Sequence, residues 1–261
     1  MNSAFLGAGH AEAVVVTGSS PLWYTTRATG LVAMVLLTIS MAFGLLSSVG
    51  YQRPALPRFV TVGLHRNASL LALAFTAAHV LTTVVDSYVN IPIQDAFIPF
   101  ISSYRPLWVG LGTVASDLLL ALTVTSLLRS RMGFRTWRAV HWTAYACWPV
   151  ALLHGLGTGS DTPVSWVLLL TLVCVAAVAA LVAWRLAVGW PAHAAFRVAG
   201  AVALLIALAA GGAWLTAGPL RPGWAQRSGT PSSVLHHAAS PVRVPGARQA
   251  LGARQALGGR S

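Results

Sequence analysis

Charge is what this sequence lacks most. Only 8% of its 261 residues are charged and five are acidic, while 56% are hydrophobic. The mean hydropathy is +0.70. A soluble helical bundle needs polar faces on its helices, and long segments of this chain have almost none. The composition therefore excludes an ordinary soluble domain and indicates an integral membrane protein.

Cysteine is also scarce. Cys147 and Cys174 are the only two, and both fall inside hydrophobic segments, so we expect small buried side chains and not a disulfide or metal site. The glycine-rich stretch GLGTGS at 155–160 follows a hydrophobic segment and not a strand. It predicts an exit turn and not a nucleotide-binding loop.

Long uncharged runs predict membrane spans, because a helix that crosses the hydrocarbon needs about 20 apolar residues. The runs predict an all-α membrane protein, a six-helix transmembrane bundle within residues 23–217. The predicted spans cover residues 28–50, 60–85, 106–128, 138–157, 164–187 and 196–217. Tryptophan and tyrosine lie near many span ends, as in an interfacial aromatic belt.

The arginines predict the orientation, because short cytoplasmic loops are enriched in positive charge. Eight arginines lie in the first, third and fifth loops. The charged residues of the second and fourth loops are one arginine, Arg105, and three aspartates. We therefore place the odd loops in the cytoplasm and both chain ends outside. Residues 1–22 form an extracytoplasmic segment in this topology.

The carboxyl-terminal tail, residues 218–261, contains six more arginines, which favour the inside by the same rule. It is rich in Gly, Pro, Ser and Ala and repeats GARQAL in tandem, a composition that predicts disorder. The net charge of +12 is thus spread over loops and tail. Without a basic domain we expect contact with the lipid bilayer and no nucleic-acid partner.

Four of the eight histidines lie in spans two and four, which run in the same direction. His65 and His141 lie toward the inner side, seven and six residues after an arginine. His79 and His154 lie toward the outer side, each seven residues before an aspartate. The four form two level pairs, separated along the two helices by about 21 and 19.5 Å.

The two helices differ in how their histidines face. His65 and His79 are fourteen residues apart, which on a helix returns to within roughly 40° of the same face. His141 and His154 are thirteen apart, which leaves them roughly 140° apart on an ideal helix. Pro149 lies between them and permits a kink or local rewinding. We expect that distortion to bring both histidines to one side.

Imidazoles from two helices can fill both axial positions of a haem. Four histidines at matched depth favour this over four separate hydrogen-bonding histidines. They predict two b-type haems between spans two and four, held non-covalently because no Cys-x-x-Cys-His motif occurs. The iron ligands are His65, His79, His141 and His154. With no open axial position, we expect electron transfer and no catalytic residue at iron.

The run from about Trp23 to Asp161 resembles the ferric reductase-like transmembrane domain family. The stretches that carry the resemblance are WYTTRATGL, LHRNASLLALAFTAAHV, SDLLLALTVTSLLRSRMG and FRTWRAVHWTAYACWPVALLHGLGTG. The family includes eukaryotic ferric reductases, NADPH oxidases and the haem subunit of a bacterial methionine sulfoxide reductase system. The resemblance implies that His65 pairs with His141 and His79 with His154.

The resemblance also implies transmembrane electron transfer to ferric iron or a partner redox protein outside. In the oxidases and eukaryotic reductases the last core helix leads into a flavin and nicotinamide domain, whereas here a further helix and tail follow. We expect no FAD or NAD(P) site in this chain. It would be an oxidoreductase component whose electrons come from a separate flavoprotein or quinol.

Charged side chains near the pairs could compensate the haem propionates. The candidates are Arg66, Arg135 and Arg138 at the inner level and Arg27 at the outer end of span one. Ordinary inside-positive or interfacial roles explain these arginines equally well. Asp117, the one acid at membrane depth, could orient a ligand histidine, relay a proton or pair with an arginine.

The alternative function is a non-redox membrane scaffold, or a small transporter whose histidines line a polar cavity. A transporter would usually show internal repeats or two broken helices at corresponding positions. This chain shows only the interruption at Pro149. A reduced b-type haem spectrum would separate the two functions.

Overall fold

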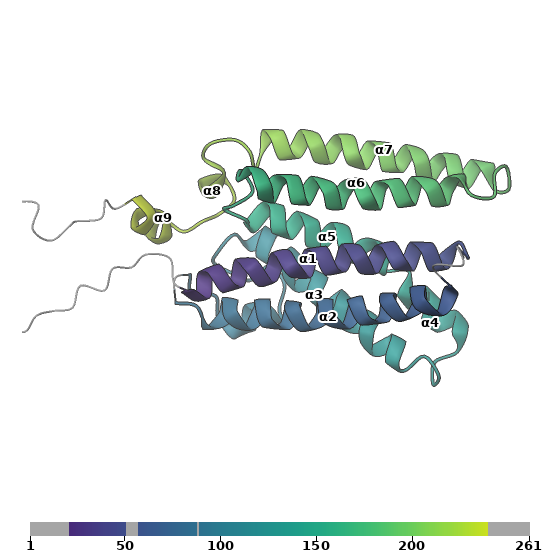
Figure 1. Ribbon diagram of the computed structural model, residues 1–261. Coiled ribbons are helices and arrows are strands. Elements are labelled where there is room, and N and C mark those ends of the chain that lie inside the picture. Colours follow the sequence, from purple (N-terminus) through teal and green to yellow (C-terminus); the bar gives the residue numbers. More distant parts are fainter. Residues whose placement is uncertain (1–20, 51–56, 88, 240–261) are drawn as a thin grey trace, which may run out of the picture.

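The computed structural model describes residues 21–50, 57–87 and 89–239, and in these ranges the chain is helical with no strand (Figure 1). The helices are α1 Pro21–Ser48, α2 Arg58–Val85, the 3-10 helix η1 Ile93–Ala96, α3 Pro106–Leu127, α4 Phe134–His141, α5 Ala144–Thr158, α6 Ser165–Ala187, α7 Ala194–Ala217, α8 Trp224–Arg227 and α9 Ser232–Ala239. The all-α prediction is confirmed for this part of the chain.

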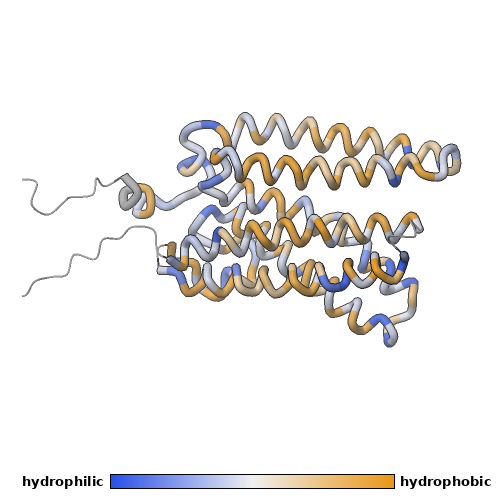
Figure 2. Tube along the Cα trace, in the orientation of Figure 1, coloured by the Kyte–Doolittle hydropathy of each residue, from blue (hydrophilic) through white to orange (hydrophobic). Residues whose placement is uncertain are grey.

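Five of the helices in the described ranges, α1, α2, α3, α6 and α7, are long and apolar enough to cross a membrane. Hydrophobic residues run along their full length, and hydrophilic residues gather mostly at their ends (Figure 2). The chain is a multi-pass membrane protein. The fourth predicted span, residues 138–157, differs from the prediction because its residues are divided between the short helices α4 and α5.

The long helices lie side by side (Figure 1). The most extensive contacts join α1 to α2 and α3 to α5, and α1 also packs against α6. Helix α7 lies at the edge of the bundle beside α6 and has no buried residue. The start of α1 and the end of α7 lie at the same end of the bundle (Figure 1). We name this the outer end, after the predicted orientation, and the opposite end the inner end.

The break between α4 and α5 comes from a tightening of the helix before Pro149. The backbone N–H groups of Thr143, Tyr145 and Ala146 donate to carbonyls three residues back, at 2.9, 3.1 and 2.9 Å. Such bonds overwind the helix to about three residues per turn. Pro149 lies inside α5, where its ring disfavours a regular carbonyl position at Tyr145. The rewinding expected from the proline therefore occurs one turn earlier.

The core between the helices includes both cysteines. Cys147 packs with Leu119 and Leu122 of α3, and Cys174 of α6 packs with Trp148 of α5. Both thiols are free and buried. The small buried role predicted for them is confirmed.

Part of the predicted disordered tail is ordered. Within residues 218–239, the indole N–H of Trp224 donates to Gly157 O of α5 at 3.0 Å. Arg105, just before α3, donates to Thr230 Oγ1 at 2.9 Å, and Val234 packs on the loop after α2. The tail's first half thus covers the outer end. Residues 240–261, and residues 1–20 of the predicted amino-terminal segment, lie outside the described ranges.

Candidate functional site

The four histidines meet in two pairs. The ring centroids of His65 and His141 are 6.1 Å apart with an interplanar angle of 80°. Those of His79 and His154 are also 6.1 Å apart, at 81°. These are the pairs that the family resemblance implies. In each pair α2 supplies one ring, and the α4–α5 segment supplies the other.

The ring separation suits one metal ion between two imidazoles. A metal–imidazole bond is about 2 Å long and a ring nitrogen lies about 1 Å from its centroid, so two axial rings have centroids about 6 Å apart. Among the described residues, no three metal-binding side chains come together. The protein could therefore supply two axial ligands at each pair, and a planar macrocycle would have to supply the rest.

Backbone carbonyls hold three of the four rings. The Nδ1 atoms of His65, His79 and His154 donate to Ser40 O, Thr26 O and Trp108 O at 2.8, 2.8 and 2.7 Å. Because a carbonyl oxygen only accepts, Nδ1 carries the proton and Nε2 keeps its lone pair. This is the tautomer that a metal-ligating histidine needs. The helices α1 and α3 therefore orient rings that belong to α2 and α5.

Glycines let these helices approach the rings closely. A Cβ at Gly30 or Gly44 of α1 would lie 3.0 Å from His79 Cε1 or 3.3 Å from His65 Cε1. A Cβ at Gly112 of α3 would lie only 2.4 Å from His154 Cε1. The sequence analysis missed these residues. Gly30 and Gly44 are fourteen residues apart, the same spacing as the histidines of α2, and that match could have identified them.

His141 is held differently from the other three. Its Nδ1 is buried and has no hydrogen-bond partner within the described ranges. Its ring stacks on Trp137 of α4, with centroids 4.9 Å apart and an angle of 23°. The guanidinium of Arg129 lies over the Trp137 ring, 4.7 Å from its centroid. The inner pair thus has Trp137 as an aromatic neighbour.

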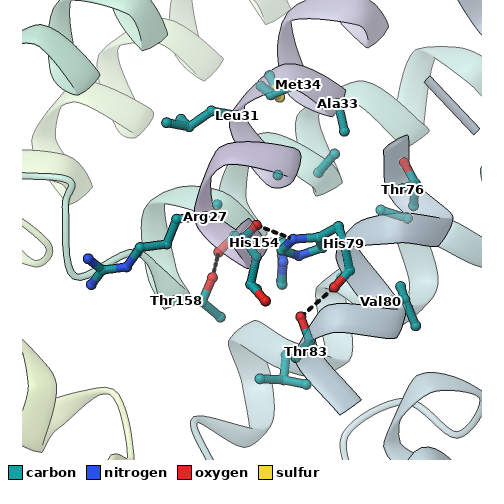
Figure 3. A pocket seen from close by; sticks show the side chains of 18 of the residues that line it. Arg27, Leu31, Ala33, Met34, Thr76, His79, Val80, Thr83, His154 and Thr158 are labelled. Carbon is teal, nitrogen blue, oxygen red and sulfur yellow. Dashed lines mark hydrogen bonds between the residues drawn. The ribbon is translucent and has the colours of Figure 1, made fainter. Parts of the chain in front are cut away.

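The outer pair lies in a cavity of about 270 Å³ that is lined mostly by apolar side chains. Figure 3 shows His79 and His154 beside Leu31 and Met34 of α1 and Val80 of α2. Close-packed protein interiors rarely leave voids larger than a water molecule. A cavity of this size at the histidines is therefore suited to a ligand and is too large for a packing defect.

Arg27 lines this outer cavity. Its guanidinium pairs with Asp161 at 3.0 Å, contacts Ser160 Oγ and lies over the Trp23 ring at 4.8 Å. Asp161 was not among the predicted site residues. Residues 155–158, predicted as an exit turn, are the last residues of α5, and Asp161 follows shortly after the helix ends. This position brings Asp161 opposite the start of α1, which the sequence alone did not indicate.

The other charged residues predicted near the histidines are exposed. Arg66 of α2 and Arg135 and Arg138 of α4 are exposed toward the inner end, and Arg138 lies over Trp142. Asp117 is exposed on α3 and does not line the outer cavity. The orienting role considered for Asp117 is carried at three histidines by carbonyls instead.

Residues 29–152 match a family model described as the ferric reductase like transmembrane component. Over these residues the chain is similar to that transmembrane component. The match extends from α1 into α5 and includes three of the paired histidines, with His154 two residues beyond it. No curated protein and no solved structure matched the chain. Helices α6 to α9 lie outside the matched residues.

Proposed function

We propose that this protein carries electrons across the membrane through two non-covalently bound b-type haems. His65 and His141 would hold the inner haem, and His79 and His154 the outer one. The observation that carries the proposal is the repeated pair geometry: two imidazole pairs share one separation and nearly one angle. A structural role for four unrelated histidines gives no reason for that repetition.

The residues around the pairs fit haem. The backbone carbonyls set the tautomer that leaves Nε2 to a metal. The glycines allow α1 and α3 to close on the rings, and the apolar cavity at the outer pair suits a macrocycle. When bound, haem iron with two axial histidines supplies one-electron transfer and has no position for a substrate. The protein's part is to hold, orient and shield the two centres.

The proposed topology has six passes, with α4 and α5 together forming the fourth. Two observations support it: the start of α1 and the end of α7 share one end of the bundle (Figure 1), and the exposed arginines of α2 and α4 gather at the other end. A short, broken pass is tolerated where neighbouring helices cover it. A topology reporter fused after Ser261 should therefore be active outside the cytoplasm.

Electrons would enter at the inner end and leave at the outer end. The donor in this proposal is a cytoplasmic flavoprotein or a membrane quinol, and the acceptor is ferric iron or a partner redox protein. The family match supports membrane electron transfer as the type of activity. The protein would act as an oxidoreductase component that depends on its donor.

The test is the visible spectrum and haem content of the purified full chain. Protein from cells supplied with iron and haem precursor should show a reduced b-type spectrum and two haems per chain. His193, which lies in the turn before α7, provides the control: His193→Ala should keep both haems. A colourless preparation would refute the proposal and favour a non-redox scaffold or transporter.

A further inference from the structure

Helix α5 ends one turn after His154, and residues from other parts of the chain bind its last carbonyl groups. A helix leaves its last four carbonyls without partners inside the helix. Gly157 O accepts hydrogen bonds from Arg105 Nη1 and from the Trp224 indole N–H, both at 3.0 Å. Thr158 O accepts a bond from Arg105 Nη1 at 2.9 Å. The turn that follows His154 is therefore held from outside the helix.

Three tryptophans, from α3, α7 and α8, meet beside this helix end. The centroid of the Trp108 ring lies 5.1 Å from that of Trp214 and 5.5 Å from that of Trp224. A Cβ at Gly157 would overlap the Trp108 ring, so α5 also packs closely on it. Trp108 O is the carbonyl to which His154 Nδ1 donates. The residue that orients the outer ligand is therefore packed against α5, α7 and α8.

Arg105 joins the same parts of the chain. It is 3% exposed and lies directly before α3. Its carbonyl accepts the Trp108 N–H at 2.9 Å, and its own backbone N–H donates to Gly229 O at 3.0 Å. Its guanidinium holds the end of α5 and also Thr230 Oγ1. A positive charge is favourable at this helix end because the carboxyl terminus of a helix is partly negative.

We infer that Trp224 and Arg105 are positioning residues for His154, and that residues 214–230 form part of the outer haem site. The inference rests on the proposed function. Residues 214–230 lie beyond the family match, so this part of the site is additional to the matched domain. Trp224 would act along two connections: through Gly157 O on the end of α5, and through the Trp108 ring on the carbonyl that holds His154.

This role has a consequence for the outer reduction potential. A hydrogen bond from Nδ1 to a carbonyl makes a histidine a more basic ligand. A more basic ligand favours oxidised iron, and hydrogen bonds around the ligands are one way in which a protein sets the potential. Loss of Trp224 should let Trp108 and the end of α5 shift, which weakens the bond from His154 to Trp108 O. The outer potential should then rise.

Redox titration and haem release of the haem-loaded full chain test this. In Trp224→Ala the outer midpoint potential should rise, and the outer haem should be released about 2- to 12-fold faster, as expected for one lost hydrogen bond. The inner haem should keep its wild-type values. The outer haem is identified as the one lost in His79→Ala. Trp224→Phe keeps a ring beside Trp108 but lacks the N–H, so its effect should be smaller.

Trp166→Ala is the matched control. Trp166 lies at the start of α6, is 60% exposed and does not line the outer cavity. It should keep both potentials and both release rates at their wild-type values.

Arg105 provides an independent variant. Arg105→Gln should raise the outer potential as Trp224→Ala does, and Arg105→Lys, which keeps the charge, should raise it less. If Trp224→Ala does not fold, Trp224→Phe and Arg105→Gln decide the question. An unchanged or lowered outer potential in these variants, or an equal shift at both haems, overturns the positioning role alone. Absence of haem from the wild type overturns the proposed function and this inference with it.

Discussion

At the outer pair both Nδ1 atoms donate to backbone carbonyls, whereas at the inner pair only that of His65 does. The outer pair is covered by α1, α3 and α6 around its cavity, and by the loop after α2. At the inner pair, His141 ends α4, a helix with no buried residue. The two pairs have the same ring separation although their rings are held by different hydrogen bonds and covered by different helices. The spacing of the rings therefore does not depend on how deeply each pair is buried. We expect the outer centre to be the better shielded and the inner centre to be the easier to reach.

The largest effect should come from removing a ring. His154→Ala should remove the outer haem and leave one haem per chain, because no other described histidine lies across from His79. His141→Ala should remove the inner haem and leave the other spectrum. Haem content and the reduced spectrum distinguish these outcomes. If His79→Ala and His141→Ala removed the same haem, the pairing would be wrong.

A somewhat smaller effect should come from adding a methyl group at the glycines that contact the histidine rings. In Gly112→Ala the new Cβ would lie 2.4 Å from His154 Nδ1, so the ring must move and its bond to Trp108 O must stretch. Overpacking of this kind costs about 1–3 kcal/mol, or roughly a 5- to 150-fold loss of outer-haem affinity. Gly44→Ala, at 3.3 Å from His65, should weaken the inner haem less.

Gly63→Ala is the matched control for these glycines, because a Cβ there meets nothing within 4 Å. It should keep both haems. The rate of haem transfer to an excess of an apo-globin, followed in the visible spectrum, measures all three variants. Equal haem retention in Gly112→Ala and Gly63→Ala would mean that the outer pair is less rigid than its hydrogen bonds indicate.

The aromatic support of the inner pair should matter moderately. Trp137→Ala removes the ring stacked on His141, a contact of about 0.5–1.5 kcal/mol. Inner-haem retention should fall by up to about tenfold, and the outer haem should be unaffected. Trp142→Ala removes an exposed ring that lies under Arg138 and should change neither haem. An equal loss at both haems would contradict the separate support of the two sites.

The smallest effect is expected at the rim of the outer cavity. Asp161→Asn breaks the ion pair with Arg27. In this pair the side chain of Arg27 is 28% exposed and that of Asp161 is 33% exposed. Partly exposed pairs contribute about 0–1 kcal/mol, so the thermal midpoint should fall slightly at low salt and hardly at all at high salt. Thermal scans at the two salt concentrations test this. A clear loss of outer haem would instead show that Asp161 positions Arg27 at the haem.

The sequence indicated the membrane class because the bilayer imposes simple rules on length and charge. The runs around α1, α2, α3, α6 and α7 satisfied them, and each is a candidate span. The fourth run could not be resolved in the same way. Its break depends on the tightening at Thr143 and Tyr145, which begins six residues before Pro149, and hydropathy contains no signal for that change.

The histidine positions were determined largely by the sequence itself, because helical periodicity converts a spacing of fourteen into one face and one difference in depth. Their environment was decided only by the tertiary structure. The carbonyls of Thr26 and Trp108 lie far from His79 and His154 along the chain, and they meet them only after the helices pack. The same packing buried Asp95, left Asp117 exposed and brought the tail to Arg105. Periodicity is a local property of one helix, whereas burial and hydrogen-bond partners depend on which helices become neighbours.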